Sequence, residues 1–289
     1  MVESTHFSEL TLEIEHHVAR ITLNNPRHLN ALSATMLGEL SEALDILGAT
    51  KHRVVVIRGA GRAFCAGYDI SPEGDEVGHA PDRSPVEDRD RLAANVELFT
   101  RIWRHPQPVI AAVHGYCIGG GGQLASLCDI TVVADEAIIM SSPSLLIGGG
   151  YLSPLWVHLV GPKRAKLVSF DAGHRISGKT AVEWGWATHS VPDDEFEEHI
   201  EQLARSIART PASVLRMKKE ALNRATELSG LLTYARMGAE TDALLHQSAE
   251  VKVVHSWIRD MGLKAAIERF NREGAPDLER PHGPAADHL

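Results

Sequence analysis

The sequence contains only three cysteines, and their number and spacing exclude a CxxC motif and a complete set of disulfides. Cys65, Cys117 and Cys128 form no CxxC pair and cannot make an even set of disulfides, which indicates a reducing compartment. No apolar run is long enough to span a bilayer, and the first residues, MVESTHFSEL, lack the basic and apolar regions of a signal peptide. We therefore expect a cytoplasmic protein without a membrane partner.

Clusters of Lys and Arg are also absent. The formal net charge is −9, whereas a surface that follows nucleic-acid phosphates needs clustered cations, so we expect no nucleic-acid partner. The 16 histidines are scattered along the chain, which gives a metal site little support. The GxSxG nucleophile motif, the HExxH zinc motif and the glycine patterns of nucleotide-binding loops are missing. We expect no metal ion and no tightly bound cofactor.

The composition that remains is ordinary, with 44% hydrophobic and 23% charged residues over 289 positions, and the length fits one large domain or one domain with an appendage. The most informative stretch is 108–129, PVIAAVHGYCIGGGGQLASLCD. Its apolar residues 109–113 predict a strand, a His-Gly turn follows, and four glycines open a segment with helical spacing. Glycines at a helix start allow close approach, and the first amides there are unpaired and electropositive. The stretch can therefore hold a developing negative charge.

The preceding residues predict an α/β crossover unit. Alternation over 11–25 indicates a hairpin, and Ser33 is a candidate N-cap for the helix that follows. The expected buried face of that helix comprises Met36, Leu37, Leu40, Ala43, Leu44 and Leu47. The continuous apolar run 53–59 is typical of a strand buried on both faces. Strand, helix and strand in this order indicate an α/β core.

Between that strand and the glycine stretch, a loop without regular structure is expected over 59–70. The polar stretch 71–82 is either a solvated surface loop or a mobile flap over a pocket. Ser84-Pro85-Val86-Glu87 combines an N-cap, a first-turn proline and a capping-box glutamate, which predicts a helix.

From residue 195 onward the pattern is helical. We therefore expect an α/β core over 1–200 that contains the pocket, and a helical C-terminal region over 201–289. The tail from about 273 is expected to be frayed.

Four segments occur in order along the chain: NPRHLNALS at 25–33, GAGRAFCAGYDI at 59–70, PVIAAVHGYCIGGGGQLASLCDI at 108–130 and RISGKTAVEWGWATHSVP at 175–192. Together they resemble the crotonase, or enoyl-CoA hydratase/isomerase, superfamily, over roughly residues 12–271. The resemblance implies a spiral of ββα units and a helical C-terminal region that packs trimers, often paired into hexamers. It also implies an acyl-CoA thioester as ligand, with coenzyme A present as part of the substrate.

Members of this superfamily stabilise an enolate-like thioester oxyanion with two backbone amides. The resemblance places these amides at Tyr68 and Gly120, where any residue with an N–H group suffices. By the same resemblance, the CoA nucleotide would lie along Arg27, Leu29, Ala66, Asp69 and Ile70. For Arg27, the alternative interpretation is a plain surface charge.

Hydratases of the superfamily use two glutamates to handle water, and the matching positions here are Gln123 and Ser144. An amide has no useful basicity, and a serine hydroxyl without a neighbouring base is a poor acid or base at neutral pH. Standard hydration is therefore not expected. Isomerisation, thioester hydrolysis, C–C cleavage or decarboxylation of an acyl-CoA fits better, in the breakdown of fatty acids, aromatic acids or secondary metabolites.

Other titratable groups are candidates for the missing acid or base. Tyr151, which follows three glycines, could be an acid or an orienting donor, or a loop aromatic packed on the core. Asp69 could be a base near the thioester, although a loop-supporting role is favoured. His114 and His158 have a suitable titration range, but structural roles are favoured for both.

Three further hypotheses stay open. The protein could be an enoyl-CoA hydratase that uses a different base. It could be a non-catalytic acyl-CoA binder, an oligomeric scaffold that kept the pocket and lost the acid–base pair. It could also be a Ser or Cys hydrolase unrelated to CoA, with Cys65 or Cys117 as nucleophile, although buried free cysteines are usually inert.

Overall fold

The computed structural model of the chain describes residues 3–72, 74, 83–145, 147 and 153–278. The possible flap at 73 and 75–82, the candidate Tyr151 and the end of the tail lie outside these residues. Within the described part, two sheets are surrounded by helices, as the α/β prediction requires. No helix of the described residues is long and apolar enough to cross a membrane.

The larger sheet contains seven strands in the order β1-β2-β3-β4-β6-β8-β10. Their bounds are β1 (Glu3–His6), β2 (Leu10–Glu15), β3 (Val18–Leu23), β4 (Val54–Gly59), β6 (Val109–Val113), β8 (Ile130–Ala134) and β10 (His189–Val191). The first three strands are antiparallel, and β3 to β10 run parallel. The hairpin predicted over 11–25 is β2–β3, and the predicted strand at 53–59 is β4, whose apolar residues are buried. Strand β1 was not predicted from the sequence.

The smaller sheet corrects two expectations. It contains β5 (Ala63–Cys65), β7 (Tyr116–Ile118) and β9 (Ile138–Met140), all parallel. The loop over 59–70 was expected to lack regular structure but contains β5, and the expected strand–turn–helix at 109–126 contains β7 before its helix. Each of these strands has three residues, too few for a periodic pattern to show. They are defined by pairing with one another across the chain.

The predicted helix caps are confirmed. Ser33 Oγ accepts the Met36 N–H before α1 (Ala34–Gly48), and Ser84 and Glu87 form a capping box before α2 (Pro85–Trp103). The remaining helices are η1 (Pro26–His28), α3 (Gly120–Ser126), α4 (Ser153–Val160), α5 (Pro162–Phe170), α6 (Gly178–Trp184), α7 (Phe196–Ala208), α8 (Ala212–Glu227), α9 (Leu231–Leu245), α10 (Ala249–Met261) and α11 (Leu263–Glu273).

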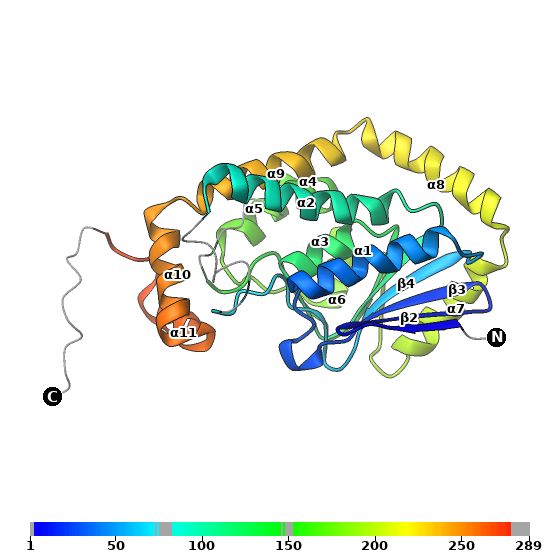
Figure 1. Ribbon diagram of the computed structural model, residues 1–289, viewed down its shortest axis with the longest axis horizontal. Helices are drawn as coiled ribbons and strands as arrows, with labels where there is room; N and C mark the ends of the chain where they lie inside the picture. Colours follow the sequence, from blue (N-terminus) through cyan, green and yellow to red (C-terminus); the bar gives the residue numbers. More distant parts are fainter. Residues whose placement is uncertain (1–2, 73, 75–82, 146, 148–152, 279–289) are drawn as a thin grey trace.

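Two apolar clusters organise the helices. The main core joins the large sheet to α1, α2 and residues of α7 and α9. Residue 200, near which the domain boundary is predicted, lies within α7, and α7 packs on the sheet. The second cluster is built by α10 and α11, which lie at the opposite end of the molecule from β2 and β3 (Figure 1). It packs against Leu145 and, through partly buried contacts, against Ile70 and Ile147.

A buried ion pair attaches α8 to the core. Lys219 Nζ lies 2.6 Å from Asp129 Oδ2 and 3.2 Å from the Gln107 carbonyl oxygen. Asp129 Oδ2 also accepts the Val109 N–H at 2.7 Å. Burial raises the pKa of Asp129 and lowers the pKa of Lys219, and the opposite charge of the partner counteracts both shifts. The last residue of the glycine stretch thus anchors α8.

Two buried histidines lie against each other near the amino ends of β4 and β6. His52 and His105 are 2% and 6% exposed, and their ring centroids are 5.1 Å apart. No described residue forms a hydrogen bond with the Nε2 atom of either ring. Burial lowers the pKa of His52 to about 4, and burial together with nearby cations lowers the pKa of His105 to about 4. Both rings are therefore neutral in the folded protein near pH 7.

We expect the unfolding free energy to be insensitive to these rings above pH 6.5 and to fall as the pH decreases from 6.5 towards 4. In that window the unfolded chain binds two protons that the folded chain does not, which costs roughly 1.4 kcal/mol per pH unit for each histidine. Urea denaturation between pH 7.5 and 4.5 should give a smaller loss for His52→Gln/His105→Gln than for the wild type. His16→Gln, whose parent side chain is 84% exposed, is the matched control. Equal pH slopes in the wild type and the double variant would contradict the assignment.

Candidate active site

The three-stranded sheet brings two loops into backbone contact. Residues 66–69 follow β5, and Gly119 and Gly120 follow β7. A Cβ atom placed on Gly67 would lie 2.8 Å from the Ile118 carbonyl oxygen and 3.2 Å from the Gly120 nitrogen. Gly67 also has a φ of +94°, which few other residues adopt. Tyr68 and Gly120, the two predicted amide donors, therefore lie on adjoining loops.

Backbone hydrogen bonds fix both loops. Gly119 donates its N–H to the Met140 carbonyl oxygen at 3.1 Å, and Gly120 begins α3, so its own N–H has no acceptor within that helix. On the other loop, Leu32 donates to the Gly67 carbonyl oxygen at 2.8 Å, and Leu32 forms a parallel β-bridge with Tyr68. The relative position of the two loops is thus set by the backbone.

Gln123 lies in the first turn of α3 and contacts the other loop through its side chain. The Tyr68 hydroxyl donates to Gln123 Oε1 at 2.7 Å, and Gln123 is 3% exposed. The Tyr68 ring lies against Gly120, since a Cβ atom placed on Gly120 would be 3.0 Å from a ring carbon. This contact was not predicted, because only an N–H group was expected to matter at position 68 and nothing local in the sequence indicates which residue a tyrosine will contact.

Asn30 is a second residue that the sequence analysis missed. Its fully buried side-chain amide donates to the carbonyl oxygens of Ala60 and Ala63 at 2.9 and 2.8 Å and accepts the Asn25 N–H at 2.9 Å. The segment 25–33 is thereby fixed to the β4–β5 turn. Asparagine is a turn-forming residue and Asn30 follows Pro26 by four positions, which was the available signal.

The predicted CoA-binding residues gather along the same junction. Ala66 donates its N–H to the Leu29 carbonyl oxygen at 3.0 Å, and Arg27 lies exposed in η1 nearby in the chain. Ile70 packs against the α10–α11 cluster. Asp69 Oδ1 accepts the Ser71 N–H at 3.0 Å, which is a loop-supporting contact.

Other acid–base candidates lie in ordinary structural contacts. Ser144 packs on Gly173, where a Cβ atom would lie 2.0 Å from its Oγ, and within the described chain no hydrogen bond joins it to Gln123. The His114 Nε2 atom lies 2.9 Å from the Gly61 carbonyl oxygen. The His158 ring lies against Tyr234, with centroids 4.9 Å apart.

The buried thiols cannot act readily as nucleophiles. Burial raises the pKa of Cys65 to about 12 and that of Cys117 well above its usual value. The reactive thiolate is therefore scarce at neutral pH. Among the described residues, no group of three His, Cys, Asp or Glu side chains could hold a metal ion.

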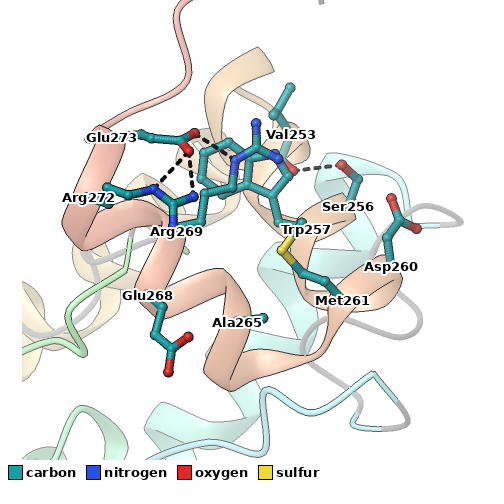
Figure 2. Close-up of a pocket in the computed structure, with 10 residues that line it drawn as sticks. All are labelled: Val253, Ser256, Trp257, Asp260, Met261, Ala265, Glu268, Arg269, Arg272 and Glu273. Carbon is teal, nitrogen blue, oxygen red and sulfur yellow. Dashed lines mark hydrogen bonds and ion pairs between the residues drawn. The ribbon is translucent and has the colours of Figure 1, made fainter. Parts of the chain in front are cut away.

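A hollow is lined by residues of α10 and α11 (Figure 2), and none of its lining residues is a predicted site residue. Its walls include Trp257 and Met261 of α10 and Arg269 and Glu273 of α11. The Arg269 guanidinium stacks on the Trp257 ring at 4.2 Å from its centroid and is also bound by Glu273. The Arg269 guanidinium already has Trp257 and Glu273 as partners within the protein. We therefore keep the region around Gly120, and not this hollow, as the candidate active site.

The two sheets and the backbone contact between the 66–69 loop and Gly120 match the crotonase fold that the resemblance implies. The sequence model of the family described as enoyl-CoA hydratase/isomerase matches residues 13–272. The chain belongs to this family, as the four segments of the sequence analysis predict.

Named relatives cover most of the chain. The chain is 32% identical over 251 residues to 1,2-epoxyphenylacetyl-CoA isomerase of Escherichia coli, with 83% of this chain and 90% of that protein aligned. It is 31% identical to hydroxycinnamoyl-CoA hydratase-lyase of Pseudomonas fluorescens, over 90% of this chain and 96% of the relative. The crystal structure of an enoyl-CoA hydratase/isomerase from Xanthobacter autotrophicus is similar with a TM-score of 0.84 and 33% identity, over 92% of this chain and 99% of that one.

Two adjacent glycines of α3 offer a test of the loop contact. A Cβ atom on Gly121 would lie 2.4 Å from the Cys65 carbonyl oxygen, whereas one on Gly122 would meet nothing within 4 Å. Gly121→Ala should lower the unfolding free energy by about 1–3 kcal/mol because backbone has to move. Gly122→Ala should leave it unchanged or raise it by up to about 1 kcal/mol through helix propensity. Chemical denaturation measures both, and equal effects would refute the contact.

Proposed function

We propose that this chain is an enzyme that acts on an acyl-CoA thioester and stabilises its enolate oxyanion with the N–H groups of Tyr68 and Gly120. The observation that carries the proposal is the backbone contact between Gly67 and Gly120, which brings the two donors onto adjoining loops. Donors of this kind act strongly because they are fixed before charge develops, and one such donor is commonly responsible for a hundredfold or more in rate.

The substrate's coenzyme A would lie along Arg27, Leu29, Ala66, Asp69 and Ile70. The hydrogen bond from Ala66 to Leu29 supports this, because it joins the two segments that would line the nucleotide. Arg27 would supply a cation to a phosphate. No tightly bound cofactor is needed for enolate chemistry of this type, since the thioester carbonyl itself accepts the electron pair.

The reaction we propose is not standard hydration. Gln123 is held by Tyr68 where a hydratase of the superfamily would place a glutamate, and an amide cannot deprotonate water. Ser144 packs on Gly173 and has no carboxylate to offer. Isomerisation, C–C cleavage, thioester hydrolysis and decarboxylation all need the oxyanion donors and do not require that pair of glutamates. The name of one relative, an isomerase, supports a reaction outside hydration, whereas the names of two others include hydratase activity.

Crotonyl-CoA tests this choice. We expect the purified protein to hydrate it at least about a hundredfold more slowly than a two-glutamate hydratase assayed in parallel, because general acid–base catalysis contributes about that factor or more. The loss of the enoyl absorbance gives the rate. Hydratase-like efficiency would contradict the proposal and favour a different base, and Asp69→Asn, Tyr151→Phe and His114→Gln would then identify it.

A non-catalytic acyl-CoA binder or scaffold is the second candidate, and the replacement of both glutamates favours it. Binding of CoA thioesters without turnover of any member of a broad panel would support it. Turnover that a single pocket substitution abolishes would exclude it.

We also propose that the protein forms a homotrimer or homohexamer through its C-terminal helices. Large apolar side chains on α8 and α9 and between them are exposed: Met217, Leu222, Leu228, Tyr234, Met237 and Leu244. Such a face is typical of an interface, and a second copy of the chain is the partner that the family resemblance implies.

Charge placed on this face should prevent assembly. We expect the wild type to have the mass of three or six chains in light scattering after size exclusion, and Leu222→Glu/Met237→Glu to have the mass of one. Val86→Glu, which changes an exposed apolar residue on α2, is the control and should assemble as the wild type does. A monomeric wild type would overturn this part of the proposal.

A further inference from the structure

Side-chain hydrogen bonds join α8 to the end of α2 and to the connection between α2 and β6. Lys219 Nζ donates to the carbonyl oxygens of Ile102 and Gln107 at 3.3 and 3.2 Å. One turn further along α8, Asn223 Nδ2 donates to the Trp103 carbonyl oxygen at 2.8 Å. All three acceptors are backbone carbonyls, so the attachment of α8 depends on the conformation of the α2–β6 connection.

His105 lies in the middle of this connection and is buried. Its Nδ1 atom lies 3.3 Å from both the backbone nitrogen and the carbonyl oxygen of Gln107. The Gln107 N–H can only donate, so the neutral His105 ring accepts it at Nδ1. The Gln107 carbonyl oxygen then remains an acceptor for Lys219. A neutral ring is therefore compatible with the attachment of α8.

His52 packs against His105 and is itself held in a neutral form. The Thr50 hydroxyl donates to the Leu47 carbonyl oxygen at 3.1 Å, so its oxygen accepts the Nδ1–H group of His52 at 2.8 Å. The two imidazole centroids are 5.1 Å apart. A proton added to either ring would thus place a cation against the other buried ring.

The charges around the two rings add to this cost. Burial, together with His52, Lys219 and Arg101, lowers the pKa of His105 to about 4. A protonated His105 would also have to donate from Nδ1 to the Gln107 carbonyl oxygen, in competition with Lys219. The charged and titratable groups on the packed elements are Arg101 of α2, which pairs with Asp45 of α1, Lys219 of α8, and Cys128 and Asp129 before β8.

We propose that His52 and His105 form an acid-sensitive switch, in which protonation of the two rings displaces Lys219 from Gln107 and releases α8 while the large sheet stays folded. Release is local and precedes the unfolding of the whole chain. Because α8 carries Met217 and Leu222 of the proposed interface, release would also break up the trimer or hexamer. Only this last consequence rests on the proposed assembly.

Hydrogen exchange at pH 7.0 and 5.0, measured by mass spectrometry and corrected for the intrinsic effect of pH, tests the switch. A histidine that regains its ordinary pKa on release favours release as the pH falls from 6.5 towards 4, by up to about tenfold per pH unit. We therefore expect the protection of α8 peptides to fall at least about tenfold at pH 5.0. Peptides from β4 and β6 should lose less than about threefold, since they exchange through larger openings.

Two variants assign the response to the rings. His52→Gln/His105→Gln should keep α8 protected at pH 5.0, because neither amide gains a proton. His52→Gln alone, which leaves the contact of His105 with Gln107 in place, should show a smaller loss than the wild type and serves if the double variant does not fold. His16→Gln, whose parent side chain is 84% exposed, is the matched control and should respond as the wild type does.

An equal loss of protection in α8 and in the two strands would overturn the proposal, because the response would then belong to the whole chain. A loss in α8 that survives in the histidine variants would also overturn it and would point to Asp129, the carboxylate that pairs with Lys219. Light scattering at the same two pH values should show the wild type, but not the double variant, losing mass at pH 5.0. A wild type that is monomeric at pH 7.0 would refute the proposed assembly, and hydrogen exchange would still decide whether α8 is released.

Discussion

The contact between the backbones of Gly67 and Gly120 is the constraint on which the candidate site depends. The segments that contain these glycines are far apart in the sequence. They approach so closely that a Cβ atom on Gly67 would force the two backbones apart. Glycine allows that approach, and the short strands β5 and β7 maintain it, since each leads directly into one of the loops. Asn30 also supports this arrangement, because its side-chain amide fixes segment 25–33 to the β4–β5 turn.

Local signals were sufficient for much of the fold. Ser33 and the capping box at Ser84 and Glu87 specify helix starts through contacts within four residues, and the apolar run of β4 indicates burial by itself. Strands β5 and β7 were missed because their pairing is long-range. For the same reason, the sequence could suggest the amide of position 68 through a family resemblance but not the Tyr68–Gln123 hydrogen bond, whose partners are 55 residues apart. The domain boundary near residue 200 remains a prediction.

Charge is used sparingly inside the molecule, and it joins distant elements. The buried pair of Lys219 and Asp129 attaches α8 to the end of the glycine stretch, where breaking it would leave a charge without compensation. By contrast, the thiols of Cys65 and Cys117 are kept neutral by burial on either side of the loops. Among the described residues, the neutral hydrogen-bonded pair of Tyr68 and Gln123 lies beside Gly120. Polarity without a full charge suits the stabilisation of a transient anion.

The packing of α10 and α11 on Ile70 and Leu145 has a consequence for how the protein is made. These two helices are synthesised after the loops whose apolar side chains they cover. Until residues 249–273 emerge, the nascent chain carries exposed apolar surface beside its own candidate site, and such surface promotes association with other chains. A chain that stops short of α10 would thus be a hazard for aggregation as well as an incomplete protein.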